Sequence, residues 1–147
     1  MAALRSTQET SPHTEPYRTL HNGRRGPNRN IVLPGQTVFV SVRVVRRHYL
    51  LKPDDELKEA ILYLMGHYAG KWGQEILGFC FMSNHFHLIL TDPRGRLPKF
   101  MEELDSMLSR VINKRLGRQG RLWESKPYTS WELETREELL QHLVYVV

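Results

Sequence analysis

The sequence predicts one domain of mixed α+β architecture, built as an antiparallel sheet with helices packed on it. A chain of 147 residues has room for a single hydrophobic core. Apolar residues alternate with period two in some segments and recur at helical spacing in others. These segments follow one another as strand, helix, strand, strand, helix and strand, with a final helix, and this order favours one sheet with helices on one face.

Residues 1–34 are expected to form a flexible basic arm ahead of a folded domain over residues 35–147. The first thirty residues hold five arginines, two glutamates and three prolines, without apolar periodicity. No apolar run approaches the ~20 residues of a membrane span, and no secretory signal is recognisable. The lone cysteine, Cys80, fits a reducing compartment. We therefore expect a cytoplasmic protein without a membrane partner.

The first half of the domain is predicted to contain a strand, a helix and a hairpin. Alternating valines predict a strand over residues 37–45 that is buried on one face only. A proline, an acidic residue and helical spacing predict a helix over 53–68. The continuous apolar run 76–82 predicts a strand covered on both faces, and alternation predicts its hairpin partner over 85–91.

The second half is predicted to repeat a helix and a strand before the last helix. One apolar stripe runs through residues 97–115, the clearest helix of the chain. A short strand is expected over 128–133. Thr135 and Glu138 then have the spacing of a capping box, which starts the last helix. The order is the ferredoxin-like β-α-β-β-α-β pattern, a fold that by itself does not determine function.

His85 and His87 are predicted to share one face of their strand, because side chains alternate along a strand. Phe86, Leu88 and Leu90 point to the opposite, apolar face, which is expected to pack on the helices. The histidines are therefore expected on the open face, where a substrate could reach them. Two neutral imidazoles suit a divalent metal that takes further ligands. Exposed histidine pairs without any such role are about as common.

Tyr145 lies in the predicted last helix. At 100° per residue, the leucines and valines of this helix fill one broad arc, and Tyr145 falls opposite its middle, on the polar side. An outward tyrosine is most simply an amphipathic surface residue. It is also a competent nucleophile towards a phosphodiester when a metal polarises the phosphate.

Two segments together resemble one family over residues 37–147. FMSNHFHLIL, at residues 81–90, resembles the histidine strand of the HUH single-strand DNA transposases, particularly the REP-associated tyrosine transposases. GRLWESKPYTSWELETREELLQHLVYVV, at residues 120–147, is similar to that family's aromatic strand, acidic-capped helix and catalytic tyrosine.

The resemblance implies a function and a site. His85 and His87 match the histidines that bind a divalent cation, Mg²⁺ or Mn²⁺, and Tyr145 matches the nucleophile. In this family the tyrosine attacks phosphorus, keeps the 5′ phosphate as a covalent ester and releases a 3′ hydroxyl. The implied partner is single-stranded DNA with a hairpin, such as a REP-like element, and a homodimer is an open alternative to a monomer. We thus expect a transposase that cuts and rejoins one DNA strand.

The family continues beyond its tyrosine and often takes a third metal ligand one helical turn later. This sequence ends at Val147, so we expect a domain truncated at its C-terminus, in which Gln141 or His142 would have to serve as auxiliary ligands. The alternative is a domesticated or impaired relative that binds DNA hairpins without cutting them. An RNA-binding ferredoxin-like domain is a weaker alternative, because the paired aromatic strand motif of an RRM is absent.

The formal net charge of +5 and the pI near 9.6 favour a polyanionic partner. Arg115, Arg118 and Arg121 lie in or beside a basic loop and are candidate contacts to the DNA backbone. Trp123 is either a stacking surface for a base or a core anchor, and the sequence favours neither.

Overall fold

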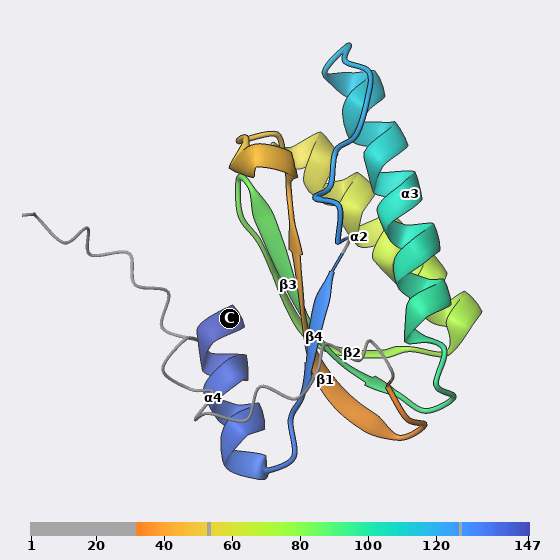
Figure 1. Cartoon of the computed structure of the whole chain (residues 1–147), viewed down its shortest axis with the longest axis vertical. Coiled ribbons are helices and arrows are strands. Elements are labelled where there is room, and N and C mark those ends of the chain that lie inside the picture. Colours follow the sequence, from red (N-terminus) through yellow and green to blue (C-terminus); the bar gives the residue numbers. More distant parts are fainter. Residues whose placement is uncertain (1–31, 53, 127) are drawn as a thin grey trace, which may run out of the picture.

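The computed structural model describes residues 32–147 except 53 and 127, and nearly all of the predicted arm lies outside this range (Figure 1). One sheet has the order β2-β3-β1-β4 with antiparallel neighbours throughout. This is the predicted ferredoxin-like arrangement, which is confirmed. The elements in chain order are β1 (Gln36–Arg43), the 3-10 turn η1 (Val45–Arg47), α2 (Asp55–Trp72), β2 (Glu75–Phe81), β3 (His85–Asp92), α3 (Leu97–Arg115), β4 (Thr129–Glu132) and α4 (Arg136–Val146).

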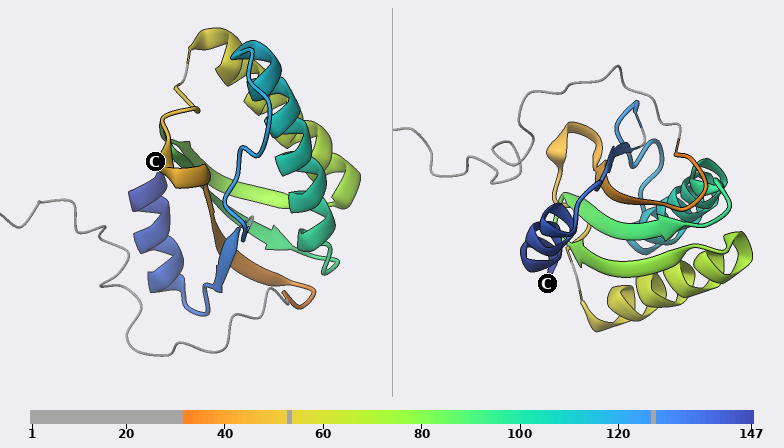
Figure 2. Two further views of the ribbon diagram at one scale, coloured as in Figure 1. Left: turned by 45° about the horizontal axis from the view of Figure 1, so that its top comes forward. Right: turned by 90° about the horizontal axis from the view of Figure 1, so that it is seen from below.

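The sheet lies between two layers of helix. α2 and α3 cover one face and α4 lies on the other, as Figures 1 and 2 show. Phe86, Leu88 and Leu90 are fully buried under α2 and α3, as the alternation in β3 predicts. A smaller cluster around Phe39 and Ile89 is buried under α4. No helix of the described residues is long and apolar enough to span a membrane.

Local signals place the helix ends. The carboxylate of Asp54 accepts from the backbone N–H of Leu57 at 2.9 Å and begins α2, while Gly73, at φ 68°, ends it. At the other end of the chain, Thr135 and Glu138 form the predicted capping box of α4. These caps satisfy backbone groups that a helix end would otherwise leave without a partner.

The strand burial differs from the prediction in two places. β1 is buried on both faces, since Phe39 is 0% exposed under α4. β2 is the edge strand next to β3, and its Leu77 and Phe79 are 45% and 41% exposed rather than covered. The two differences have separate causes. α4 covers Phe39 on the second face of β1, whereas Leu77 and Phe79 belong to an edge strand that has no neighbouring strand on its outer side.

Asp105 is a buried carboxylate in the middle of α3. It is 5% exposed, and no hydrogen bond reaches either carboxylate oxygen from the part of the chain that the structure describes. Desolvation raises the pKa of Asp105 well above its ordinary value. The pKa of the nearby Tyr128 is raised to about 12, first by burial and then by the charge of Asp105.

Replacing Asp105 should change how stability depends on pH. The folded state keeps the Asp105 proton to higher pH than the unfolded chain does, so wild-type stability falls as the pH rises above the unfolded pKa of roughly 3.9. Asp105→Asn removes this titration. The variant should therefore gain on the wild type as the pH rises above about 4, by at most about 1.4 kcal/mol per pH unit.

Urea unfolding at a series of pH values measures the difference. Asp55→Asn is the control, because that side chain is 98% exposed. Parallel pH profiles for Asp105→Asn and the wild type would show that Asp105 is not held protonated by burial.

Candidate metal and tyrosine site

His87 lies in the middle of the sheet, on the face that α4 covers. In register it stands between Cys80 of β2 and Ser41 of β1. Its ring is stacked on Phe39 at 4.9 Å between centroids and lies 5.7 Å from the ring of Tyr145. Because α4 covers it, His87 is only 1% exposed. The prediction that both histidines lie on an open face is therefore wrong for His87.

His85 lies two residues earlier on the same face and is half-buried. The two imidazole rings are 4.9 Å apart and nearly perpendicular. Nδ1 of His85 lies 2.6 Å from the side-chain oxygen of Asn84. An amide oxygen can only accept, so Nδ1 is the donor in this contact, and in the neutral ring Nε2 is the nitrogen that can bind a metal ion. A histidine that is oriented in this way by a second residue is typical of metal ligands.

Burial and the groups around His87 favour its neutral form. The pKa of His87 is lowered from 6.5 to about 3, mainly by burial and then by electrostatic interaction with His85, Arg43 and His142. Because this pKa lies well below 7, His87 is neutral at neutral pH. The neutral imidazole is the form that binds a metal ion.

Arg43 is a site residue that the sequence analysis missed. It is the last residue of β1 and pairs in register with His85, so both side chains lie on the face that carries α4. Pairing the first strand with the histidine strand would have found it, but that register is not visible in the amino-acid pattern. Arg43 adds a permanent positive charge beside the two imidazoles.

α4 packs with a different face from the one predicted. Its contact stripe consists of Leu139, His142, Leu143 and Val146, and Tyr145 lies at the edge of this stripe. The remaining apolar side chains of the predicted arc are exposed: Leu140 by 51%, Val144 by 82% and Val147 by 98%.

The narrow stripe has a geometric reason. A helix on a single sheet buries residues spaced i, i+3, i+4 and i+7, which is narrower than the arc of leucines and valines in α4. The buried face is thus turned toward His142. This turn brings Tyr145 to the sheet instead of away from it, which corrects the predicted outward position.

Gly78 allows α4 to approach the sheet closely. A Cβ atom at this position of β2 would lie 3.1 Å from Cδ2 of Leu143 and 3.7 Å from Cγ1 of Val146. Glycines in strands often mark such a close approach. The distance of Tyr145 from the histidines therefore depends on Gly78, which lies in β2 beside the histidine strand β3.

The two proposed auxiliary residues have different surroundings. His142 is 1% exposed, its Nδ1 lies 2.7 Å from the backbone oxygen of Glu138, and its ring packs on Phe39 at 4.9 Å. Gln141 is exposed on the outer side of α4. His142 thus belongs to the packed floor of the site, whereas Gln141 faces solvent.

The donor set fits a cation that takes part of its coordination from a ligand. Nowhere in residues 32–147, apart from the two undescribed positions, do three or more His, Cys, Asp or Glu side chains gather to hold a metal. His85 and His87 provide two nitrogen donors on a rigid strand. Nitrogen donors suit Mn²⁺ better than the harder Mg²⁺, and both ions keep open positions for water and phosphate oxygens.

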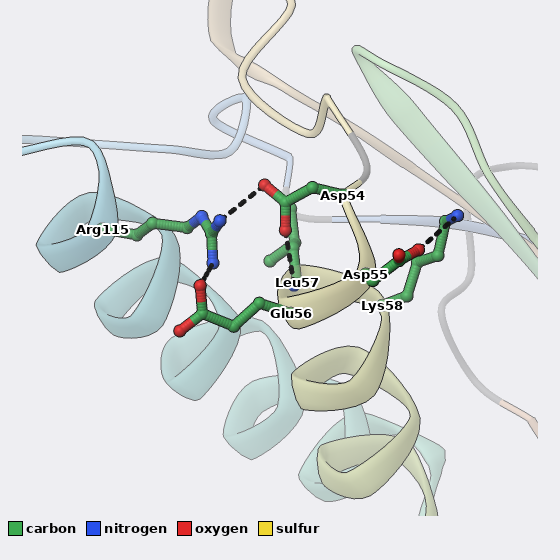
Figure 3. Close-up of polar contacts among 6 residues, drawn as sticks. All are labelled: Asp54, Asp55, Glu56, Leu57, Lys58 and Arg115. Carbon is green, nitrogen blue, oxygen red and sulfur yellow. Dashed lines mark hydrogen bonds and ion pairs between the residues drawn. The ribbon is translucent and has the colours of Figure 1, made fainter.

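The four predicted DNA contacts have different positions. Arg115 forms ion pairs of 2.6 Å with Asp54 and with Glu56, and so joins the end of α3 to the start of α2 (Figure 3). Trp123 is 7% exposed and donates from Nε1 to the backbone oxygen of Asp105, so it is the core anchor of the two alternatives. Arg118 donates to Asn113, and Arg121 is exposed.

Comparison with known proteins identifies the family. The family model of the IS200-like transposases matches residues 36–142, which is most of the chain. The chain belongs to this family. It is therefore a transposase by family, and the resemblance that the two segments carry is confirmed. The amino-acid sequence has no detectable match among curated proteins.

Solved structures share the fold of this IS200-like transposase. A REP-associated tyrosine transposase bound to a REP hairpin superposes with a TM-score of 0.65 at 17% identity, over 82% of this chain and 70% of that one. A putative transposase from Deinococcus radiodurans has a TM-score of 0.55 at 19% identity, over 78% and 91%. The tRNA(His) guanylyltransferase from Saccharomyces cerevisiae has a TM-score of 0.53 at 13% identity, over 79% and 58%. A nucleotidyltransferase among these shows that the fold alone does not assign the activity.

Gly78→Val should loosen α4 of this IS200-like transposase without unfolding the rest. The added side chain collides with Leu143, and overpacking of this kind costs about 1–3 kcal/mol. Amide hydrogen exchange in α4 should become roughly tenfold faster or more, while α2 and α3 keep their protection. Gly66→Val is the control, because nothing lies within 4 Å of a Cβ at that exposed position. Unchanged exchange in α4 of Gly78→Val would mean that this contact does not hold the helix.

Proposed function

We propose that this IS200-like transposase cuts and rejoins single-stranded DNA through a covalent bond to Tyr145, with a divalent cation held by His85 and His87. The observation that carries the proposal is the 5.7 Å between the rings of Tyr145 and His87 on one face of the sheet. A nucleophile and a phosphate-binding cation must meet at the same phosphorus atom. The ring contact brings the side chain of Tyr145 to the imidazole that would hold the cation.

Each residue has a distinct role in the proposed reaction. When bound, the cation supplies positive charge that polarises the scissile phosphate and stabilises the charge that develops there. The oxygen of Tyr145 loses its proton to solvent and forms an ester bond to phosphorus. The bond from phosphorus to the 3′ oxygen breaks, and that oxygen takes up a proton. Rejoining is the reverse reaction, so no nucleotide triphosphate is needed.

Arg43 and Asn84 assist these residues. The guanidinium of Arg43 is opposite His85 in register and provides a second positive charge for the phosphate. Asn84 holds the His85 ring through Nδ1, so that Nε2 is directed to the cation. The neutral state of His87 at pH 7 keeps its donor nitrogen available for the same ion.

Hairpin DNA is the proposed substrate. Support comes from the fold shared with a REP-associated tyrosine transposase that was solved with a REP hairpin, and from the net charge of +5. A homodimer remains part of the proposal only as an alternative to a monomer. A binding protein without cleavage is the second candidate function, since the described residues provide two metal ligands and no third.

A covalent adduct distinguishes cleavage from binding. We expect the wild type, mixed with Mn²⁺ and a labelled hairpin oligonucleotide with single-stranded flanks, to give a DNA-linked band on a denaturing gel. Tyr145→Phe should lose the band, because phenylalanine has no nucleophilic oxygen. Tyr63→Phe is the matched control on α2, where the side chain is 70% exposed and distant from the histidines.

The outcomes separate the two functions. A Tyr145-dependent band supports the transposase. A band of equal strength from Tyr145→Phe would assign the chemistry to another residue. If the wild type binds the oligonucleotide but forms no band, the binding protein is the better description.

A further inference from the structure

The short turn after β1 has an unusual backbone. Arg46 and Arg47 both have positive φ angles, of 53° and 55°. Residues other than glycine seldom adopt this left-handed region, and two in succession are rarer still. Backbone strain of this kind persists only where surrounding structure imposes it, and it is concentrated at functional sites. We call residues 45–50 the η1 loop.

Hydrogen bonds from the β2–β3 turn hold the η1 loop in this conformation. The side chain of Asn84 donates to the backbone oxygen of Arg47 at 3.4 Å. The backbone oxygen of Asn84 accepts from the backbone N–H of Val44 at 2.9 Å. At the other end, the N–H of Leu51 donates to the oxygen of Ser83 at 2.8 Å. The loop is thus attached on both sides to the turn that begins β3.

Val45 and Leu50 at the two ends of the η1 loop pack against the core, whereas the four residues between them do not. Arg46, Arg47 and His48 are exposed, and Tyr49 is 74% exposed. Within the part of the chain that the structure describes, no carboxylate forms an ion pair with Arg46 or Arg47. Packing of the Arg46 and Arg47 side chains therefore does not explain their positive φ angles. The loop backbone carries two guanidinium groups and an aromatic ring into solvent.

The η1 loop lies beside the proposed cleavage site. The same Asn84 that supports the loop contacts Nδ1 of His85 at 2.6 Å. Arg43, which pairs with His85, ends the strand from which the loop continues. In Figure 1 the loop caps the end of the sheet where β3 begins, far from the other end of β3.

We propose that the η1 loop binds the single DNA strand next to the scissile phosphate, with Arg46 and Arg47 on backbone phosphates and Tyr49 stacked on a base. Guanidinium groups and an exposed aromatic ring are the two elements that proteins combine to bind single strands without reading their sequence. The inference rests on the proposed function, because it takes DNA to be the substrate of the adjacent histidine and tyrosine site.

Glycine substitution separates binding from folding. Arg46→Gly and Arg47→Gly remove a guanidinium but adopt positive φ without strain. Each variant should melt no lower than the wild type and yet bind a fluorescent single-stranded oligonucleotide more weakly. The slope of log affinity against log salt should become shallower by about 0.7 for each phosphate that the variant no longer binds. Tyr49→Ala should weaken binding roughly fivefold or more.

Two control variants match these changes. Arg94→Gln removes an exposed arginine at the opposite end of β3, and Tyr63→Ala removes an exposed tyrosine from α2. Both should bind the oligonucleotide as the wild type does. Fluorescence anisotropy in EDTA measures binding in the absence of cleavage, so the result does not depend on catalysis.

The possible results are distinct. Weaker binding by the three η1-loop variants alone supports the inference. If these variants bind like the wild type, or if Arg94→Gln and Tyr63→Ala weaken binding as much, the η1 loop does not hold the DNA, although the proposed function stands. If the wild type itself does not bind the oligonucleotide, both proposals are wrong. A lower melting temperature of Arg46→Gly and Arg47→Gly with unchanged affinity would assign the loop a structural role.

Discussion

The packing of α4 on the histidine face of the sheet is the contact on which the site depends. Phe39 is the centre of this contact, since its ring meets His87, Trp131 and His142. A buried phenylalanine of this kind typically contributes about 3–5 kcal/mol of stability. Gly78 has no side chain, and this allows Leu143 and Val146 of α4 to pack closely on β2. Without this contact Tyr145 would have no defined position relative to the histidines.

The same contact sets the electrostatics of the site. Covering His87 removes it from water, which is the largest cause of its low pKa. The covered imidazole stays neutral beside the permanent positive charge of Arg43. His85 stays half-buried and closer to solvent, so a cation or a phosphate can approach from its side. One packing event therefore positions the tyrosine, neutralises one proposed ligand and directs access to the other.

Much of the fold could be predicted because local signals were strong. The limits of α3 and the capping box at Thr135 follow from residue types at fixed spacings, and the start of α2 was predicted to within two residues. The shared face of His85 and His87 follows from strand alternation. The orientation of α4 could not be predicted, because its leucines and valines offer more than one apolar stripe and only the sheet selects among them. The paired position of Arg43 and the burial of Trp123 depend on register and loop path, which leave no mark in a single sequence.

The central claim is that Tyr145 lies beside a cation held by His85 and His87. Broadening of NMR signals by bound Mn²⁺ tests it most directly, because this paramagnetic ion broadens the signals of nearby nuclei most strongly. We predict that substoichiometric Mn²⁺ broadens the ring signals of Tyr145 together with those of His85 and His87. The ring of Tyr63 on α2 should stay sharp, and His85→Ala combined with His87→Ala should abolish the effect. A sharp Tyr145 ring beside broadened histidines would contradict a single site formed by the sheet and α4.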